Sequence, residues 1–253
     1  MLNQATLDQL HQMKLTGFVE ALREQAENPG MYHGMSFEER LGLLVDHEWA
    51  SRENRRLSQR LRQARLREPA CLEDLDYHLP GRKIDRHAVV QLAQGRWIAN
   101  KENLLVTGKT GVGKSYLACA FANQACRSGY STLYTRLPTL LMDMEIARGA
   151  GTYRHIMRRL GKVNLLVIDD WGLAPMGDAA RRDLLEVFEE RYDRGSVLIA
   201  SQLDVADWHG VVGDATLADA ILDRLVHNAH RIKLDGPSVR DTKKGLRNKR
   251  EKE

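Results

Sequence analysis

The sequence lacks the features that mark secreted or membrane-embedded proteins. Its three cysteines, Cys71, Cys119 and Cys126, include no C-x-x-C pair, so neither a disulfide framework nor a zinc site is indicated. Its apolar runs, such as Val163 to Ile168, are far shorter than the ~18 residues of a membrane-spanning helix. No apolar block follows a basic start at the N-terminus, as a secretory signal would require. We therefore expect a cytoplasmic protein with no membrane partner.

The composition also lacks the bias of disordered or fibrous chains. Hydrophobic residues make up 43% and charged residues 28% of the chain, there are only 6 prolines, and no internal repeat is present. A length of 253 residues suffices for one large or two small globular domains. The composition therefore predicts a globular protein with a sizeable core.

Basic residues exceed acidic ones by 38 to 34, and they are unevenly distributed. Residues 52–67 contain seven arginines and one acid, Glu53. On a helix, Arg52, Arg56 and Arg60 would lie one turn apart, in a row that can follow a phosphate backbone through charge and bidentate hydrogen bonds. We take this row as a candidate DNA-binding surface. An ordinary solvated helix face would give the same pattern.

The N-terminal part of the sequence has helical periodicity and no strand pattern. Ser36 and Glu39 form a capping box that predicts the start of a long helix. We expect its apolar residues to form a core-facing stripe: Leu41, Leu44, Val45, Trp49, Leu57 and Leu61. The predicted organisation is a helical domain over residues 1–67 that binds DNA or a partner, a second domain over 68–240 that begins with a loop-rich connector (68–101), and a basic, disordered tail over 241–253.

The clearest pattern in the sequence is the octapeptide from Gly108 to Ser115. It reads G-x-x-x-x-G-K-S, follows a predicted strand and precedes a predicted helix, which is the context of a P-loop. Its glycines allow backbone amides to surround a phosphate. Lys114 is expected to reach the β and γ phosphates and the Ser115 hydroxyl to bind Mg²⁺. The predicted nucleotide-binding residues are Gly108, Thr110, Gly111, Val112, Gly113, Lys114 and Ser115.

A second apolar run, residues 163–170, ends in two acids and predicts a central parallel strand. A P-loop enzyme needs a metal-side carboxylate at such a position. We expect Asp169 to hold Mg²⁺ through water and Asp170 to orient or deprotonate the attacking water. Two acids here could instead cap the following helix.

Strands and helices alternate through the rest of the chain. Strands are predicted at 103–107, 131–135, 163–170, 197–200 and 231–234, and helices at 137–148, 152–160, 178–194 and 217–226. This order predicts an α/β fold of P-loop type: a five-stranded parallel sheet with helices on both faces, the nucleotide bound at the carboxyl ends of the strands.

Two further polar residues are candidates for sensing the nucleotide. Gln202 follows the strand at 197–200 and could contact the γ phosphate or the attacking water, or only cap a turn. Arg224 lies in an otherwise apolar predicted helix and could reach the nucleotide of a neighbouring subunit, where transition-state charge needs a cation. An internal ion pair of Arg224 with Asp219 or Asp223 is the alternative.

Four segments together resemble the IstB family, the AAA+ helper ATPases of bacterial insertion sequences. They are Gly108 to Ser115, Leu165 to Gly172, Ser201-Gln202, and Ala218 to His230. The resemblance extends from about Ser36 to Arg240, which is most of the chain.

The resemblance implies an ATPase that uses ATP and Mg²⁺, assembles as a homo-oligomer with ATP at subunit interfaces on double-stranded DNA, and recruits or activates the transposase of the same element. By position, it makes Gln202 the sensor-one residue, Arg224 the arginine finger and Arg240 the sensor-two arginine. Asp170 departs from the Glu that is common in AAA+ ATPases. Because its side chain is one methylene shorter, we predict slow turnover.

Two alternatives share the P-loop. A DnaC-like replicative helicase loader has the same ATPase core but binds a helicase through its N-terminal domain. The Asp-Asp-Trp-Gly sequence at 169–172 and the arginine-dense segment favour the transposition helper. A small-molecule kinase would need an arginine-rich lid between the core strands, and none is evident.

Overall fold

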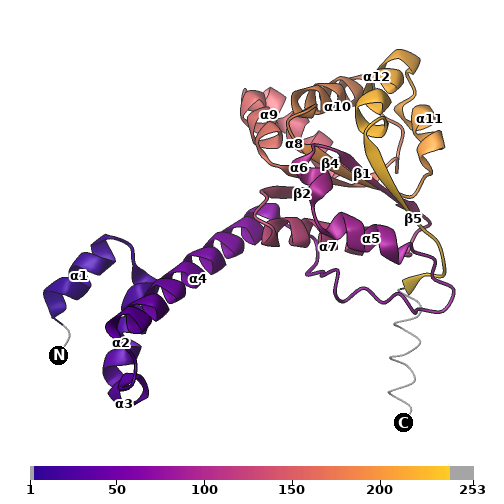
Figure 1. Cartoon of the computed structure of the whole chain (residues 1–253). Helices are drawn as coiled ribbons and strands as arrows, with labels where there is room; N and C mark the ends of the chain where they lie inside the picture. Colours follow the sequence, from indigo (N-terminus) through magenta and orange to yellow (C-terminus); the bar gives the residue numbers. More distant parts are fainter. Residues whose placement is uncertain (1–2, 240–253) are drawn as a thin grey trace, which may run out of the picture. The chain divides into compact units, whose positions relative to one another are not determined.

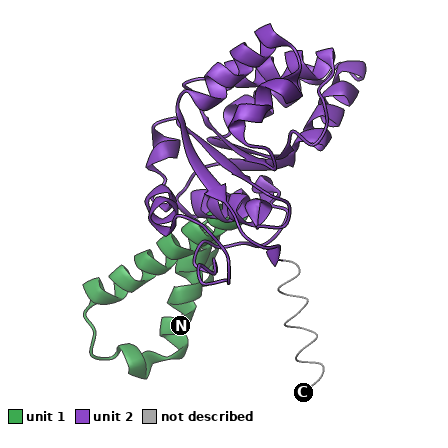
Figure 2. Ribbon diagram, turned by 90° about the vertical axis from the view of Figure 1, so that its right-hand side faces the viewer, with its two compact units in different colours: residues 1–59 green, residues 60–253 purple. Residues whose placement is uncertain are grey.

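The computed structural model describes residues 3–239. The chain divides into two compact units, residues 1–59 and residues 60–253, which Figure 2 shows in different colours. The division falls inside the long helix α4 (Phe37–Ala64). The domain boundary predicted at residue 67 remains a prediction, and the tail predicted over 241–253 lies outside the described residues.

Unit 1 is helical, as predicted. It contains α1 (Gln4–Gln12), α2 (Thr16–Glu27), the short α3 (Pro29–Tyr32) and the first part of α4. The capping box is present: the Ser36 amide donates to Glu39 Oε2 at 2.7 Å, and the Glu39 amide donates to Ser36 Oγ at 3.2 Å. These reciprocal bonds satisfy two amides that the first turn of α4 leaves without helical partners.

The core-facing stripe predicted for α4 is wrong for this part of the helix. Leu44 is buried, whereas Leu41, Val45 and Trp49 are exposed, Trp49 to 66%. The reason is the way in which α2 meets α4. A Cβ at Gly17 would lie 2.7 Å from Ser51 Cβ, so the two helices touch closely, and polar side chains make much of the contact. Only a narrow side of α4 is therefore buried within unit 1.

Unit 2 is built on a five-stranded parallel sheet, which confirms the predicted fold (Figure 1). The strand order is β2-β3-β4-β1-β5. The strands are β1 (Asn103–Gly108), β2 (Thr132–Arg136), β3 (Leu165–Trp171), β4 (Ser196–Ser201) and β5 (Ala229–Leu234). The central strands are buried on both faces, because Leu104 and Val106 of β1 belong to one core and Leu105 to the other.

Helices cover both faces of this sheet (Figure 1). One face packs against α5 (Arg86–Ala93), α6 (Arg96–Ala99) and α7 (Lys114–Arg127). The other packs against α8 (Leu137–Gly149), α9 (Tyr153–Lys162), α10 (Asp178–Arg191), α11 (Trp208–Val212) and α12 (Ala215–Val226), with the 3-10 helix η1 (Val205–Asp207) leading into α11. No helix within residues 3–239 is both long and apolar enough to cross a membrane.

The connector at 68–101 contains more regular structure than its prolines and glycines predicted. Helix α5 begins where the Asp85 side chain accepts a hydrogen bond from the Ala88 amide, and it buries Val89 and Leu92 against the sheet. These two apolar residues supply the tertiary packing that a short helix needs. The prolines and glycines around them had favoured the prediction of a loop.

Candidate active site

The P-loop joins β1 to α7, as its sequence pattern predicts. Gly113 is the N-cap of α7, with φ +98° and no side chain to cap the helix. The first turn of α7 therefore has no side-chain cap at its N-cap residue, and the helix dipole favours a phosphate there. Lys114 is buried, and its Nζ donates to the Lys109 carbonyl at 2.7 Å, so the ammonium lies over the loop.

The segment that follows β5 packs onto the same loop. The Val239 amide donates to the Gly111 carbonyl at 2.9 Å. Gly111 has φ +85°, and a Cβ there would lie 2.6 Å from Ser238 Oγ. Only glycine fits both this backbone conformation and this close approach. The P-loop is thus held from outside by the chain immediately before Arg240, a predicted site residue that lies outside the described residues.

Asp169 is buried at the carboxyl end of β3, with 2% of its surface exposed. The Tyr134 hydroxyl donates to its Oδ2 at 2.6 Å, and Arg67 Nη1 lies 3.7 Å from the same oxygen. Burial and the hydrogen bond to Asp169 raise the pKa of Tyr134, so the tyrosine remains a donor. The hydrogen bond with Tyr134 and the attraction of Asp169 raise the pKa of Arg67. These contacts fix the carboxylate in one orientation.

Asp170 has a left-handed backbone, with φ +60°, where the pairing of β3 with β4 shifts register. A bulge of this kind redirects a side chain away from the regular pleat. The carboxylate forms an ion pair with Arg136 Nε, and its own amide donates to Asp169 Oδ1 at 2.8 Å. The acid that the sequence assigns to water activation is therefore held by an arginine at the end of the neighbouring strand β2.

Gln202 lies beside the P-loop, just after β4. Its Oε1 accepts a hydrogen bond of 2.7 Å from Thr110 Oγ1. Ser201 is buried, and its hydroxyl donates to the Trp171 carbonyl at 2.9 Å, so it has a structural partner on β3. Gln202, rather than Ser201, is thus the residue of this pair that is placed against the nucleotide loop.

The structure brings most of the predicted site residues to one cavity of about 510 Å³, a size typical of small-molecule sites. The predicted residues that line it are Thr110, Gly111, Gly113, Lys114, Ser115, Asp169, Asp170 and Gln202. Gly108 and Val112 belong to the loop, but they do not line the cavity; Val112 is buried in the core behind it.

Three arginines of this cavity were not predicted: Arg67, Arg82 and Arg136. The position of Arg136 after a predicted strand was a usable signal, because the carboxyl ends of parallel strands meet at the crevice. Arg82 comes from the connector, where no pattern marks it, and Arg67 is the last arginine of the segment 52–67, which we interpreted as a DNA-binding helix. Arg82 Nη1 donates to the Asp76 carbonyl at 3.0 Å, and its buried Nε has no hydrogen-bond partner within the described part of the chain.

The donors of this cavity fit ATP and Mg²⁺. The buried Nε of Arg82, the ammonium of Lys114 and the uncapped amides of α7 are groups that bind phosphate oxygens. The Ser115 hydroxyl and the Asp169 carboxylate are hard oxygen ligands, which Mg²⁺ prefers. The site therefore combines a phosphate cradle with a place for a divalent cation.

Arg224 lies away from this cavity. Its guanidinium forms ion pairs with Glu189 at 2.5 Å and with Asp223 at 3.7 Å, and Nη1 donates to the Ala220 carbonyl. It lines a small hollow together with Asn103, the first residue of β1, whereas the nucleotide cavity lies at the other end of the strands. Arg224 therefore cannot act on the cavity of its own chain; any role at a nucleotide would be in a neighbouring subunit.

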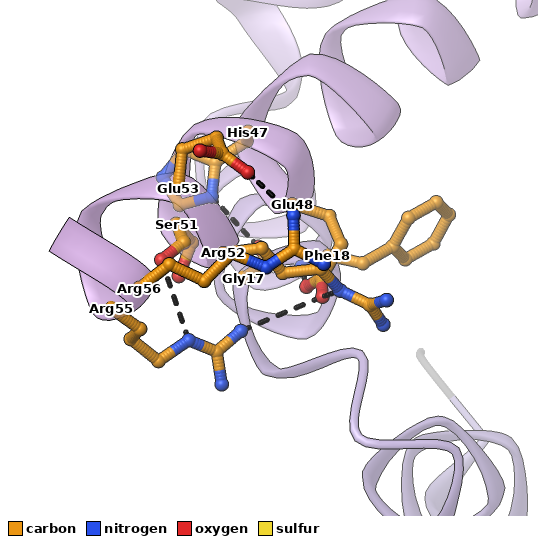
Figure 3. A network of polar contacts seen from close by, with 9 residues as sticks. All are labelled: Gly17, Phe18, His47, Glu48, Ser51, Arg52, Glu53, Arg55 and Arg56. Carbon is orange, nitrogen blue, oxygen red and sulfur yellow. Dashed lines mark hydrogen bonds and ion pairs between the residues drawn. The ribbon is translucent and has the colours of Figure 1, made fainter. Parts of the chain in front are cut away.

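The predicted DNA-binding arginines of unit 1 are paired with acids (Figure 3). Arg52 Nε donates to Glu48 Oε1 at 2.5 Å, and Arg56 Nη1 donates to Glu53 Oε1 at 2.6 Å. Burial disfavours the charge of Glu48, but the hydrogen bonds from Arg52 and from the Phe18 amide outweigh it and lower the Glu48 pKa. In unit 2, Arg60 Nε donates to the Cys126 carbonyl at 2.8 Å, which places it against the end of α7.

Known proteins share both the sequence and the fold. The solved structure of DnaI superimposes with a TM-score of 0.57 at 22% identity, over 70% of this chain and 94% of DnaI. That of the DnaC helicase loader gives 0.50 at 16% identity, over 59% and 87% of the two chains. At these identities the likeness concerns the fold alone.

The sequence comparisons are more specific. A protein of Sinorhizobium fredii named as the insertion sequence ATP-binding protein y4pL is 50% identical over 240 residues, which are 95% of this chain and 97% of the relative. Residues 8–247 match the family described as IstB-like ATP binding protein. The chain therefore belongs to the IstB-like ATP-binding proteins, a family of AAA+ ATPases.

Proposed function

We propose that this protein is an ATP-dependent transposition helper that assembles on double-stranded DNA and recruits or activates the transposase of the same insertion sequence. The observation that carries the proposal is the meeting of Lys114, Asp169 and Asp170 in one cavity, in a chain 50% identical to an insertion sequence ATP-binding protein. We also propose that it works in the cytoplasm, where its DNA target lies.

In this proposal some residues of the cavity bind the nucleotide and others act in its hydrolysis. Lys114 and the α7 amides bind the phosphates, while Ser115 and Asp169 hold Mg²⁺. The cation, when bound, neutralises charge on the phosphates. Tyr134 keeps Asp169 oriented through its hydrogen bond. Gln202, which accepts a hydrogen bond from Thr110, is positioned to respond to changes at the P-loop.

Asp170 orients the attacking water or accepts its proton. A carboxylate held by a guanidinium is not free to contact a water molecule. The ion pair between Asp170 and Arg136 must therefore open before Asp170 can act. The resting cavity is thus arranged for ATP binding more than for hydrolysis, which supports the prediction of slow turnover.

Assembly follows if Arg224 acts on the nucleotide of a neighbouring subunit. Glu189 and Asp223 neutralise its charge in the isolated chain, and half or more of each acid's side chain is exposed. An exchange of these partners for a phosphate would make ATP a link between two copies. Linked copies would add their weak DNA contacts, including those of Arg52 and Arg56, into a much stronger total.

The test is to image the purified protein on duplex DNA with a nonhydrolysable ATP analogue, with ADP and without nucleotide. We expect ordered clusters or filaments only with the analogue. DNA binding by monomers that is equal in all three conditions would contradict the proposal. Capture of a replicative helicase without assembly on DNA would instead support the loader function.

A further inference from the structure

Three arginines line the nucleotide cavity, and Arg82 differs from the other two. Arg67 and Arg136 lie beside the two acids at the end of β3. Arg82 forms no ion pair with the described part of the chain. Its guanidinium donates one hydrogen bond there, from Nη1 to the Asp76 carbonyl at 3.0 Å. Within residues 3–239, the positive charge of Arg82 is therefore not matched by a carboxylate.

The guanidinium of Arg82 is also partly removed from water. Its Nε is buried and has no hydrogen-bond partner among the residues that the structure describes. Burial lowers the pKa of Arg82, and the attraction of Asp76 does not offset this effect. A buried donor without a partner costs free energy, and so does a charge that has lost part of its hydration. An anion bound at this guanidinium would offset both costs.

Arg82 lies against the P-loop. A Cβ at Gly113 would lie 3.3 Å from Arg82 Nη2, so the guanidinium is next to the N-cap residue of α7. In a P-loop, the backbone amides and the N-terminus of the helix surround the α and β phosphates of the nucleotide. The Lys114 ammonium lies over the same loop, where it donates to the Lys109 carbonyl. The unmatched charge of Arg82 is therefore placed where a diphosphate is expected.

The backbone on both sides of Arg82 is fixed by hydrogen bonds. The Arg82 amide donates to the Leu79 carbonyl at 3.0 Å, across a turn in which Gly81 has φ +75°. A glycine with positive φ at the third position is typical of a type II turn. On the other side, Lys83 and Asp235 exchange two backbone hydrogen bonds, of 2.8 and 3.1 Å, directly after β5. The arginine is thus held in place before a ligand binds, which reduces the entropy lost on binding.

We propose that Arg82 is a second phosphate-binding cation of the P-loop, which the connector supplies within the same chain and which binds the α or β phosphate of the nucleotide. The inference rests on the nucleotide site of the proposed function and is independent of its DNA and transposase partners. Because ADP also carries these two phosphates, Arg82 holds the nucleotide before and after hydrolysis. It therefore adds affinity for ATP and ADP alike, whereas Arg224 is proposed to act on charge that develops only during hydrolysis.

The test compares Arg82→Gln with the wild-type protein in the binding of ADP, a nonhydrolysable ATP analogue and pyrophosphate, measured by calorimetry without DNA. We expect all three affinities to fall by a similar factor, roughly 10-fold, as is typical for the loss of one charged hydrogen bond. Pyrophosphate is the most informative of these ligands, because it lacks the base and the ribose. Lys83→Gln is the matched control, since its side chain is exposed and its backbone bonds to Asp235 are kept.

Two further measurements separate phosphate binding from support of the connector. Without ligand, Arg82→Gln should melt close to the wild-type temperature, and saturating ADP should raise this temperature less than in the wild type. Arg82→Lys, which keeps the charge but not the planar fork, should bind ADP with an intermediate affinity. An unchanged affinity for pyrophosphate in Arg82→Gln would overturn the proposal, even if the affinity for ADP fell, because the arginine would then only shape the connector around the base. A failure of assembly in the imaging experiment would not affect this result, since no DNA is present.

Discussion

Arg52 and Arg56 of unit 1 pair with acids of their own helix, whereas two arginines of unit 2 contact the acids of the nucleotide cavity. In unit 1, Arg56 and Glu53 form an exposed pair one turn apart, of a kind that stabilises a protein by about 1 kcal/mol or less. In unit 2, Arg136 holds Asp170 and Arg67 lies beside Asp169. A phosphate that takes an arginine from unit 1 disturbs only a weak surface pair. A change at Arg136 instead removes a partner of the group proposed to activate water.

This difference predicts that unit 1 determines the affinity for DNA and that unit 2 determines the rate of ATP hydrolysis. Changes in unit 1 should alter how strongly DNA is bound and how steeply binding depends on salt, but not the hydrolysis rate of bound ATP. Changes in the nucleotide cavity of unit 2 should alter nucleotide binding or hydrolysis first, and DNA binding through assembly. A unit 1 variant that changes the hydrolysis rate of bound ATP would contradict this separation.

Lys114→Ala should have the broadest effect, because assembly and hydrolysis both require bound ATP. Loss of a charged hydrogen bond to phosphate costs about 1.5–3 kcal/mol, which corresponds to roughly a 10- to 150-fold weaker ATP affinity. Because assembly depends on ATP, ordered clusters on DNA should also disappear. Titration with a fluorescent ATP analogue measures the affinity. Lys109→Ala is the matched control, because residue 109 contacts the Lys114 ammonium through its backbone carbonyl, which the substitution keeps. Equal losses in both variants would argue against the assigned role.

Arg224→Ala should reduce hydrolysis by roughly 1,000-fold or more while each chain still binds ATP, because a trans-acting arginine stabilises transition-state charge. The decisive measurement mixes this variant with Lys114→Ala. In the mixture, the intact nucleotide cavity of an Arg224→Ala chain can meet the intact Arg224 of a Lys114→Ala chain. ATP hydrolysis should therefore partly return. Arg194→Ala, which breaks an exposed pair with Glu190, is the control. No recovery on mixing would place Arg224 in a structural role.

Asp170→Asn should lower hydrolysis by roughly 100- to 10,000-fold without weakening ATP binding, as expected when a general base is removed. The variant should remain assembled on DNA after ATP is added, because the nucleotide is not consumed. Single-turnover hydrolysis and the lifetime of the clusters measure the two effects. Asp178→Asn, which changes an exposed acid paired with Arg181, serves as control. Rapid disassembly of the Asp170 variant would contradict the proposed link between hydrolysis and release.

The sequence alone predicted the local elements of the site well and its contacts poorly. The octapeptide from Gly108 to Ser115 and the run ending at Asp169 are local patterns, and the structure brings both to one cavity. The partners of the acids were not predictable in this way. Tyr134 and Arg136 lie on another strand, and they meet Asp169 and Asp170 only because β2 pairs with β3 in register.

For α4 the sequence predicted the helix correctly but not its buried residues. Helical spacing correctly predicted the helix, but it did not determine which residues become buried, since that depends on what packs against them. Glycine at position 17 allows α2 to approach α4 along the side of Glu48 and Ser51, which leaves Val45 and Trp49 exposed. Periodicity therefore predicts elements, whereas burial requires knowledge of their neighbours.

Arg56→Gln should have the smallest effect and is the most direct test of the separation between the two units. Both members of the Arg56 pair are exposed, so the variant should keep the melting temperature and the hydrolysis rate of the wild type. If Arg56 contacts one DNA phosphate, the salt slope of binding should fall by about 0.9. Arg52→Gln is an informative companion, because its partner Glu48 is buried and would lose a charged hydrogen bond, at a cost of about 1.5–3 kcal/mol in the stability of unit 1. An unchanged salt slope in Arg56→Gln would make this part of α4 an ordinary solvated surface, and DNA binding would then depend on unit 2.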